Sequence, residues 1–425
     1  MPNPDDLIII RGRGRVCAPG LDLSAYASLS AAPFQTKATG PRYLPVAQLS
    51  AAAEETLATL RRAHPAYRQL DRTVLLALLA ARQATAEAGW LPAAAGRRQI
   101  ALAEPALTNE QRVTNNEQRE IAVSVGSSRG ATERLEHFHQ DFLMSGTVPA
   151  AASPLTTLGN VASWVAFDAG STGGPALSHS STCSSAFQAL GNAVAWLRAG
   201  MATRFLAGGT EAPLTDFTLA QMYALGIYSP FPAADWPCRP GTGRPSTFVL
   251  GEGAAVFALE KVAAAALAAE QRQHPDQPVF VLEGVGFGFE ATASKTGLSP
   301  DGQHFQQAIN QALHQAGCPP AAVDAVVLHS PGTPAGDASE RAALRAVLGE
   351  KLPPLLSNKW LVGHTLGASA ALSLDFALYV LETQRWPAAP FATDLAAAAV
   401  RPIRRILVNA AGFGGNAASV VVTRL

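Results

Sequence analysis

The feature that most constrains the fold of this chain is a pattern of apolar residues and glycines that occurs twice. Leu7 to Ile10 is an apolar run followed by Arg-Gly-Arg-Gly-Arg, and it predicts a buried strand that ends in a glycine turn. Val279 to Leu282, followed by Glu-Gly-Val-Gly-Phe-Gly, predicts the same arrangement far along the chain. A repeat of this kind indicates that the chain has two related halves.

A second pair of segments supports the repeat. The strand that begins at Arg204 and the downstream strand Gly253 to Leu259 match the strand that begins at Arg405 and the downstream strand Ala418 to Thr423. We therefore expect two related α/β halves, residues 1–270 and 271–425, joined near residues 262–278.

Strands and helices alternate between these landmarks, which predicts a mostly parallel sheet covered by helices on both faces. The strand candidates are Ile121 to Val125 and Ala325 to Leu328, and the helix candidates are Thr73 to Ala88, Phe187 to Arg198, Gln303 to Ala316 and Ala368 to Glu382. A five-layered α-β-α-β-α stack satisfies both halves. Thr132 to Ser163 is interrupted by Pro149, Pro154 and Gly159, so we expect an irregular segment at the surface or at a subunit contact.

Composition narrows the class of protein. The 425 residues are 48% hydrophobic and 15% charged, with a mean hydropathy of +0.12, which predicts a compact globular enzyme. The 32 basic and 32 acidic side chains cancel, so no overall charge favours nucleic acid or an anionic membrane.

The four cysteines are widely scattered and form no C-x-x-C pair, which argues against a disulfide framework and against structural zinc. We expect a reducing, cytoplasmic location. The acidic N-terminus and the lack of a long uncharged apolar run predict neither an export signal nor a membrane anchor.

Cys183 lies in Ser-Ser-Thr-Cys-Ser-Ser at the start of an amphipathic helix. Phe187, Leu190, Val194 and Leu197 recur at helical spacing after it, and Gly200 supplies a stop. A thiolate at a helix N-terminus gains from the helix dipole and the free N–H groups, which favours a nucleophile. The alternative from position alone is a small buried residue without a chemical role.

Two histidines occur in equally distinctive settings. His329 follows an apolar strand and begins His-Ser-Pro-Gly-Thr-Pro-Ala-Gly-Asp, where a strand passes into a tight turn. His364 is flanked by Gly363 and Thr365 just before an apolar helix. Each could instead be a histidine satisfied by hydrogen bonds to the backbone. Together with Cys183, the two imidazoles indicate carbon–carbon bond formation on thioesters.

At these residues the chain resembles the β-ketoacyl-ACP synthases of fatty acid and polyketide synthesis, of the KAS I/II type, within the thiolase superfamily. The match runs almost end to end. The family's T-A-C-S-S, H-G-T-G-T-P-x-G-D, K-x-x-x-G-H-x-x-G-A, G-E-G-A and N-x-x-G-F-G-G motifs correspond to the segments around Cys183, His329 to Asp337, Lys359 to Ala368, Gly251 to Ala254, and Asn409 to Gly415.

The resemblance implies a thiolase-like fold and a Cys-His-His site of Cys183, His329 and His364. It implies that Cys183 carries the acyl group, that both histidines donate hydrogen bonds during loss of carbon dioxide from a malonyl thioester, and that Lys359 and Glu340 lie behind them. It further implies an oxyanion hole made by the backbone N–H groups of Cys183 and Phe413, with Phe413 as a mobile gate.

The resemblance also implies that the site needs no metal and no organic cofactor. The implied partners are acyl-ACP and malonyl-ACP, and the implied assembly is a homodimer or a heterodimer with a related subunit. A basic patch would dock the carrier protein, and Arg129, Arg134, Arg404 and Arg405 are candidates.

Several positions depart from the family pattern. Ser330-Pro331 replaces Gly-Thr, Ala411 stands where many relatives have phenylalanine, Asn416-Ala417 replaces Thr-Asn, and Pro213 to Gly226 is short. These changes favour a specialised pathway, for example one that builds a polyene or another secondary acyl chain. On analogy, Pro213 to Tyr228 and Thr132 to Ser163 are expected to wall the acyl tunnel.

Two other functions remain open, and a third is disfavoured. A chain-length-factor type of partner usually lacks the cysteine, and a malonyl-independent acyltransferase would share the fold. A thiolase should carry a second catalytic cysteine near the C-terminal glycines, and the sequence has none after Cys318.

Overall fold

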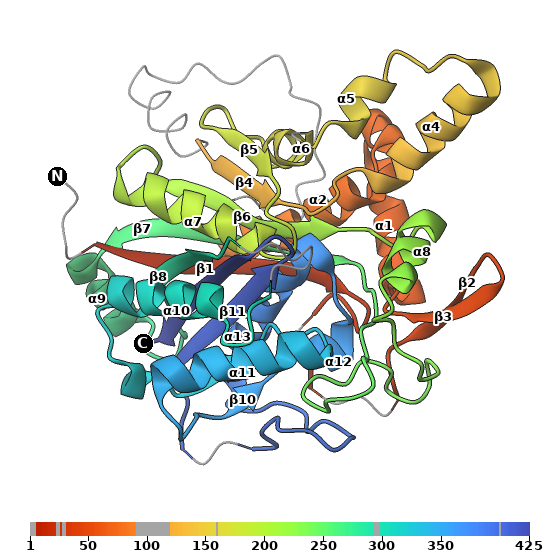
Figure 1. Cartoon of the computed structure of the whole chain (residues 1–425). Coiled ribbons are helices and arrows are strands. Elements are labelled where there is room, and N and C mark those ends of the chain that lie inside the picture. Colours follow the sequence, from red (N-terminus) through yellow and green to blue (C-terminus); the bar gives the residue numbers. More distant parts are fainter. Residues whose placement is uncertain are drawn as a thin grey trace, which may run out of the picture.

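The computed structural model describes residues 6–22, 26–27, 31–90, 120–158, 160–291, 298–398 and 401–425 (Figure 1). Its centre is a ladder of ten strands. In spatial order these are β10 (Leu355–Leu356), β9 (Ala325–Val327), β11 (Arg405–Gly412), β12 (Asn416–Arg424), β8 (Phe280–Phe289), β1 (Asp6–Cys17), β7 (Gly253–Ala263), β6 (Arg204–Glu211), β4 (Ala122–Gly126) and β5 (Ala176–His179).

The ladder consists of two five-stranded halves related by the sequence repeat. Only two residue pairs join β1 to β8, whereas β1 pairs with β7 and β8 pairs with β12 along most of their length. Both halves are mixed, so the prediction of a mostly parallel sheet was wrong. The cause is that neighbours such as β11 and β12 are joined by a tight turn, which makes a pair antiparallel.

Helices lie on both sides of each half of the ladder and confirm the five-layered α-β-α-β-α arrangement (Figure 1). α7 (Ser185–Arg198) and α13 (Ser369–Thr383) form the middle layer and share one apolar core with strands of both halves. α2 (Arg72–Glu87) and α6 (Asn160–Asp168) cover the N-terminal strands, and α10 (Gln303–Ala316) and α11 (Pro334–Leu348) cover the C-terminal ones. The predicted boundary at residues 270/271 falls inside α9 (Ala264–Gln273) and stays a prediction.

The prediction that the repeated glycines make turns was wrong, because β1 and β8 run on through them, each with one shift of register. A Cβ atom on Gly14 would overlap the Ala80 carbonyl oxygen of α2, and a Cβ atom on Gly286 would overlap the Ala308 carbonyl oxygen of α10. The glycines therefore let one helix lie directly on the long strand of each half, which is the reason the pattern occurs twice.

The segment 132–163 was predicted to be irregular and is largely helical. It forms α4 (Thr132–Ser145), α5 (Ala152–Thr156) and the start of α6, and α4 ends at Gly146 with a φ of 71°. Pro154 lies in the first turn of α5, where proline is tolerated, and Gly159 lies outside the described residues. α4 and α5 project from the body of the molecule (Figure 1).

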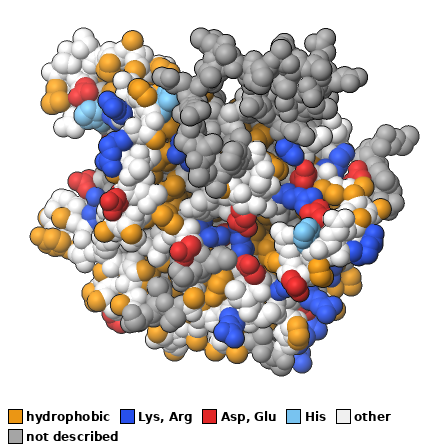
Figure 2. Space-filling model, turned by 180° about the vertical axis from the view of Figure 1, so that it is seen from behind, with side chains coloured by type: hydrophobic (Ala, Val, Ile, Leu, Met, Phe, Trp, Pro, Cys, Tyr) orange, Lys and Arg blue, Asp and Glu red, His pale blue; other side chains and the backbone are white. Residues whose placement is uncertain are grey.

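The other strands and α-helices of the described residues are the hairpin of β2 (Gln35–Thr39) and β3 (Arg42–Val46), with α1 (Ala51–Ala63), α8 (Asp216–Ala224) and α12 (Lys359–Val362). Basic and acidic side chains are interspersed on the face shown in Figure 2. One segment, Leu366–Thr383, is long and apolar enough to span a membrane, and 89% of it is buried inside the protein as the central core helix.

Candidate active site

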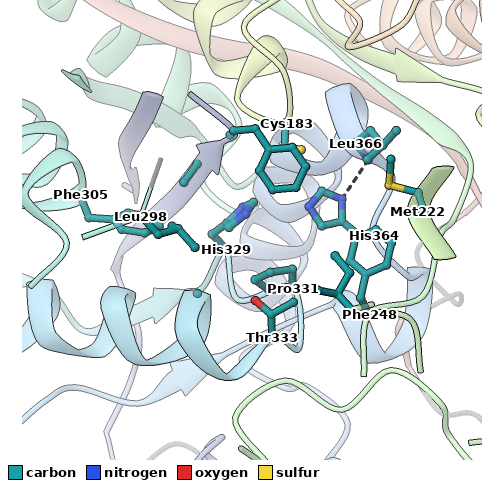
Figure 3. Close-up of a pocket in the computed structure, with 15 residues that line it drawn as sticks. Cys183, Met222, Phe248, Leu298, Phe305, His329, Pro331, Thr333, His364 and Leu366 are labelled. Atoms are coloured by element: carbon teal, nitrogen blue, oxygen red, sulfur yellow. Dashed lines mark hydrogen bonds between the residues drawn. The ribbon is translucent and has the colours of Figure 1, made fainter. Parts of the chain in front are cut away.

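Cys183, His329, His364 and Phe413 line one cavity of about 70 Å³, and Figure 3 shows the first three of these side chains around it. They come from the turn before α7, the end of β9, the turn after α12 and the β11–β12 turn. The structure thus brings together side chains that are far apart in the sequence. The space would hold on the order of five water molecules, and most of its lining is apolar.

Cys183 lies two residues before α7 on a strained turn. Thr182 has a φ of 55°, unfavourable for a residue with a branched side chain, and Ser184 caps the helix. The four apolar residues predicted to face the core from α7 are all buried. Burial raises the pKa of the Cys183 thiol to about 12, with the Glu211 charge acting in the same direction. The resting group is therefore a thiol, and the helix N-terminus does not make it a thiolate.

His364 is held as a neutral imidazole. Its Nδ1 accepts a hydrogen bond from the Leu366 backbone N–H at 3.0 Å, the dashed line in Figure 3, so its proton is assigned to Nε2. Burial, together with the nearby Lys359 cation, lowers the pKa of His364 to about 3. The Nε2–H group is consequently free to donate.

His329 lies beside His364, with ring centroids 5.4 Å apart and ring planes at 83°. Burial lowers its pKa well below the ordinary value, and the His364 and Lys359 groups lower it further. Two neutral rings set edge to face can place two N–H donors toward one point near Cys183.

Glu340 and Lys359 lie behind the histidines and act on different parts of the site. The Glu340 carboxylate accepts from the backbone N–H groups of His329 and Ser330, both at 2.8 Å, and from Asn409 Nδ2 at 3.1 Å. Glu340 therefore fixes the backbone of the first histidine. Lys359 Nζ donates instead to Ser373 Oγ at 3.2 Å, and burial lowers its pKa to about 8.

The β11–β12 turn brings Phe413 over Cys183. Gly412 packs against the cysteine turn so closely that an added Cβ atom would lie 3.0 Å from Cys183 N. Gly414 and Gly415 have φ values of 88° and 80°, which other residues rarely adopt, and Phe413 is 42% exposed. This arrangement leaves the Phe413 side chain at the cavity mouth, with its backbone beside that of Cys183.

Two family models match the chain. The N-terminal domain of β-ketoacyl synthase matches residues 28–265, and the C-terminal domain of β-ketoacyl synthase matches residues 279–390. The chain belongs to the β-ketoacyl synthase family.

Two curated ketosynthases show the range of its relatives. The alpha subunit of the tetracenomycin polyketide ketoacyl synthase of Streptomyces glaucescens is 32% identical over 319 residues, 73% of this chain and 69% of that protein. The 3-oxoacyl-(acyl carrier protein) synthase 2 of Staphylococcus aureus is 27% identical over 314 residues, again 73% of this chain and 69% of that protein.

Solved structures share the fold. A β-ketoacyl synthase from Burkholderia phymatum superposes with a TM-score of 0.79 at 22% identity, over 99% of this chain and all of that one. The ishigamide ketosynthase/chain length factor superposes equally well, with a TM-score of 0.79 at 20% identity over 99% of both chains. The thiolase-like fold expected from the resemblance is thereby confirmed.

One departure of this ketosynthase from the family pattern, Ser330-Pro331, is built firmly into the cavity wall. Ser330 Oγ donates to Glu340 and contacts Arg341, so the serine strengthens the support of His329. Pro331 lines the cavity without an N–H group to offer. Asp337 accepts from Gly332 N at 3.2 Å and from Gly241 N, which fixes the remainder of the turn.

The apolar wall was only partly visible in the sequence. Met222 and Ile227 lie in the predicted segment Pro213 to Tyr228, but Phe248 and Phe305 were missed because they come from segments without a distinctive motif. The described part of Thr132 to Ser163 contributes no residue to the cavity of the single chain, and its place in a tunnel wall formed with a second subunit stays a prediction. Among the described residues, no group of three His, Cys, Asp or Glu side chains could hold a metal ion.

Proposed function

We propose that this ketosynthase catalyses decarboxylative Claisen condensation of an acyl thioester with malonyl-ACP. The observation that carries the proposal is the buried thiol of Cys183 in one cavity with two neutral imidazoles, His329 and His364. A thiol can hold the acyl group covalently, and neutral imidazoles can donate N–H groups to a developing oxyanion without releasing a proton to it.

In the first step the Cys183 sulfur attacks the carbonyl carbon of acyl-ACP. The bond from that carbon to the carrier sulfur breaks, and the proton of the Cys183 thiol ends on the departing carrier thiol. The tetrahedral oxyanion would receive hydrogen bonds from the backbone N–H groups of Cys183 and Phe413, whose main chains lie side by side because residue 412 is glycine.

In the second step the malonyl thioester loses carbon dioxide, and the electron pair of the broken carbon–carbon bond forms an enolate. His329 and His364 would donate to the enolate oxygen. The enolate carbon then attacks the acyl-Cys183 carbonyl, the new carbon–carbon bond forms, and the cysteine sulfur leaves and takes up a proton. The products are a β-ketoacyl-ACP two carbons longer and carbon dioxide.

The pathway is proposed to be specialised, for a polyketide or polyene chain, on the strength of the polyketide relatives and of Pro331 in the cavity wall. The working assembly is proposed to be a dimer with a second copy or with a related subunit. Projecting α4 carries the exposed apolar side chains Leu143 and Met144, which suit a subunit contact.

The carrier protein is proposed to approach from the side of Arg129 and Arg134. Arg129 lies three residues after the end of β4, where its backbone N–H donates to Glu211 in the half of the molecule that carries Cys183. Arg405 begins β11 and pairs with Glu283, and about eight residues of strand, on the order of 25 Å, separate it from the cavity. Arg404 lies at that same distant end, so both are disfavoured.

Intact-mass spectrometry with native protein and Cys183→Ala tests the proposal. Native protein should gain the acyl mass from acyl-ACP and release a chain two carbons longer after malonyl-ACP is added, whereas Cys183→Ala should do neither. Loading without elongation would point to a malonyl-independent acyltransferase. Absence of loading, alone and with a co-expressed related ketosynthase subunit, would support the chain-length-factor type of partner instead.

A further inference from the structure

Glu211, the last residue of β6, is a buried carboxylate that no step described above uses. The residue is 0% exposed and does not line the cavity. Its two oxygens accept from four donors: Ser127 Oγ at 2.9 Å and the backbone N–H groups of Ser128, Arg129 and Gly367 at 2.6, 3.1 and 2.9 Å. Placing a carboxylate fully inside a protein is costly unless its charge is matched by such donors.

One of these donors belongs to the turn that supports His364. Gly367 follows Leu366, whose own N–H holds His364 Nδ1, and Leu366 has a φ of 41°. A positive φ at a leucine is unfavourable and persists only where the surroundings enforce it. Glu211, in the neighbouring half of the molecule, is the side chain that accepts from the residue directly after this leucine.

The fit between Glu211 and this turn is close. A Cβ atom at position 367 would overlap Ser128 N and lie 2.6 Å from Glu211 Oε2, so glycine lets the turn pack against both the Ser128 backbone and the carboxylate that it holds. If the carboxylate were removed, the strained Leu366 could relax, and the Leu366 N–H would turn away from His364 Nδ1. The ring would then be free to change tautomer or rotate.

We propose that Glu211 is a positioning residue for the condensation: through the Leu366–Gly367 turn it holds His364 as a neutral ring that donates from Nε2. The effect on condensation rests on the proposed function, whereas the fixed tautomer of His364 does not depend on it.

Glu211 also affects Cys183, where its charge disfavours the reactive thiolate form. Its charge raises the pKa of the thiol, whereas the Lys359 and Arg129 cations lower it. Burial raises the pKa of Glu211 itself to about 7, against the four donors that favour the charged form. Loss of the Glu211 charge should therefore make the Cys183 thiol easier to ionise, while His364 loses its fixed tautomer. A variant that merely lowers the stability of the protein would not show both effects.

The test compares Glu211→Gln with native protein and with Glu87→Gln. Glu87 is a suitable control because its carboxylate also accepts a backbone N–H, from Arg13 at 3.2 Å, yet it lies outside the cavity. Histidine ¹⁵N spectra should show a single Nε2–H tautomer for His364 in native protein and in Glu87→Gln, and a mixture in Glu211→Gln. A single Nε2–H tautomer in folded Glu211→Gln would overturn the proposal.

Kinetics supply the second readout. In Glu211→Gln the decarboxylation of a malonyl thioester should fall about 10- to 100-fold in kcat, because one fixed donor is lost, with little change in KM. Alkylation of Cys183 by iodoacetamide should not slow. Equal loss of both reactions would refute the positioning role.

Two measurements keep the test decisive if Glu211→Gln does not fold. Ser127→Ala removes one of the four donors and should shift the His364 tautomer detectably, and a mixed tautomer already present in native protein would refute the proposal. Failure of native protein to decarboxylate malonyl thioester would count against the proposed function alone, because the tautomer readout does not depend on turnover.

Discussion

Gly412→Ala should disable acyl transfer without unfolding the protein. The new Cβ atom would overlap Thr182 Oγ1 and lie 3.0 Å from both Cys183 N and Ser181 O. The β11–β12 turn and the cysteine turn would have to separate by about 1 Å, and a displacement of that size at a reacting group costs roughly 100-fold in rate, or about 2.7 kcal/mol. Acylation of Cys183, followed in a single turnover by mass spectrometry, should fall by about that factor.

A second substitution identifies the contact responsible. Thr182→Ala removes Thr182 Oγ1, the atom that the new Cβ would overlap. In native protein this hydroxyl donates hydrogen bonds to Ser181 O at 2.7 Å and Phe413 O at 3.4 Å. Thr182→Ala alone should acylate at close to the native rate, and the double variant should recover most of the loss. Native-like acylation by Gly412→Ala would refute the close packing of the two backbones on which the oxyanion hole depends. A double variant as slow as Gly412→Ala would show that Thr182 is not the obstacle.

Three further outcomes are expected. His364→Asn should flatten the acid side of the stability curve. Because the folded pKa of about 3 lies below the unfolded value near 6.5, the unfolded chain takes up a proton that the native protein does not, and native protein loses up to about 1.4 kcal/mol of unfolding free energy per pH unit as pH falls between the two values. Urea titrations from pH 6.5 to 4.5 should show native protein losing about 2 kcal/mol more than the variant, since the slope is only half its maximum at the unfolded pKa, and parallel curves would contradict the burial argument. Glu340→Gln should leave acylation of Cys183 intact but slow malonyl decarboxylation about tenfold or more. The amide would present its own N–H groups to the backbone N–H groups of His329 and Ser330, which donate to Glu340 in native protein. Equal slowing of both steps would count against this role. Met222→Ala should cost about 2–5 kcal/mol in urea unfolding and move the preference toward longer acyl chains in a competition among acyl-ACPs, and an unchanged preference would exclude Met222 as a wall of the acyl site.

The sequence predicted well what depends on local pattern. The α10 helix occupies the predicted residues, and Cys183 does precede a helix whose apolar residues are buried. The glycines of β1 were found but misinterpreted, because a glycine that admits a helix and a glycine that turns a chain look alike without the partner. The partner is α2, more than fifty residues away in the sequence, and its contact with Gly14 is set by tertiary structure and leaves no local pattern.

The apolar residues that line the cavity could not be predicted from local sequence patterns for the same reason. Phe248 and Phe305 lie in segments typical of ordinary core. They line one space because tertiary packing sets their rings beside His364 and His329, with ring centroids 5.3 and 6.3 Å apart. The role of Glu211 could not be predicted either, since an acidic residue at the end of a strand is usually exposed to solvent. Its burial, and the four donors that balance it, appear only when residues of both halves are placed together.

The repeat explains why the site needs both halves at once. β6 and β11 are equivalent strands in the sequence repeat, and their last residues are Glu211 and Gly412. Glu211, in the N-terminal half, holds the turn beside His364 in the C-terminal half, and Gly412, in the C-terminal half, packs on the turn that carries Cys183 in the N-terminal half. Each half thus fixes the reactive residue of the other.

This exchange has a consequence for the proposed division at residues 270/271. Each half alone would leave its side of the core shared by α7 and α13 uncovered, and would also lack the contact that orders its reactive turn. The thiol turn and the histidine turn should therefore become ordered only when the halves associate. Because the reciprocal contacts lie at the ends of β6 and β11, beside the middle layer of α7 and α13, packing of that layer and assembly of the site are one event.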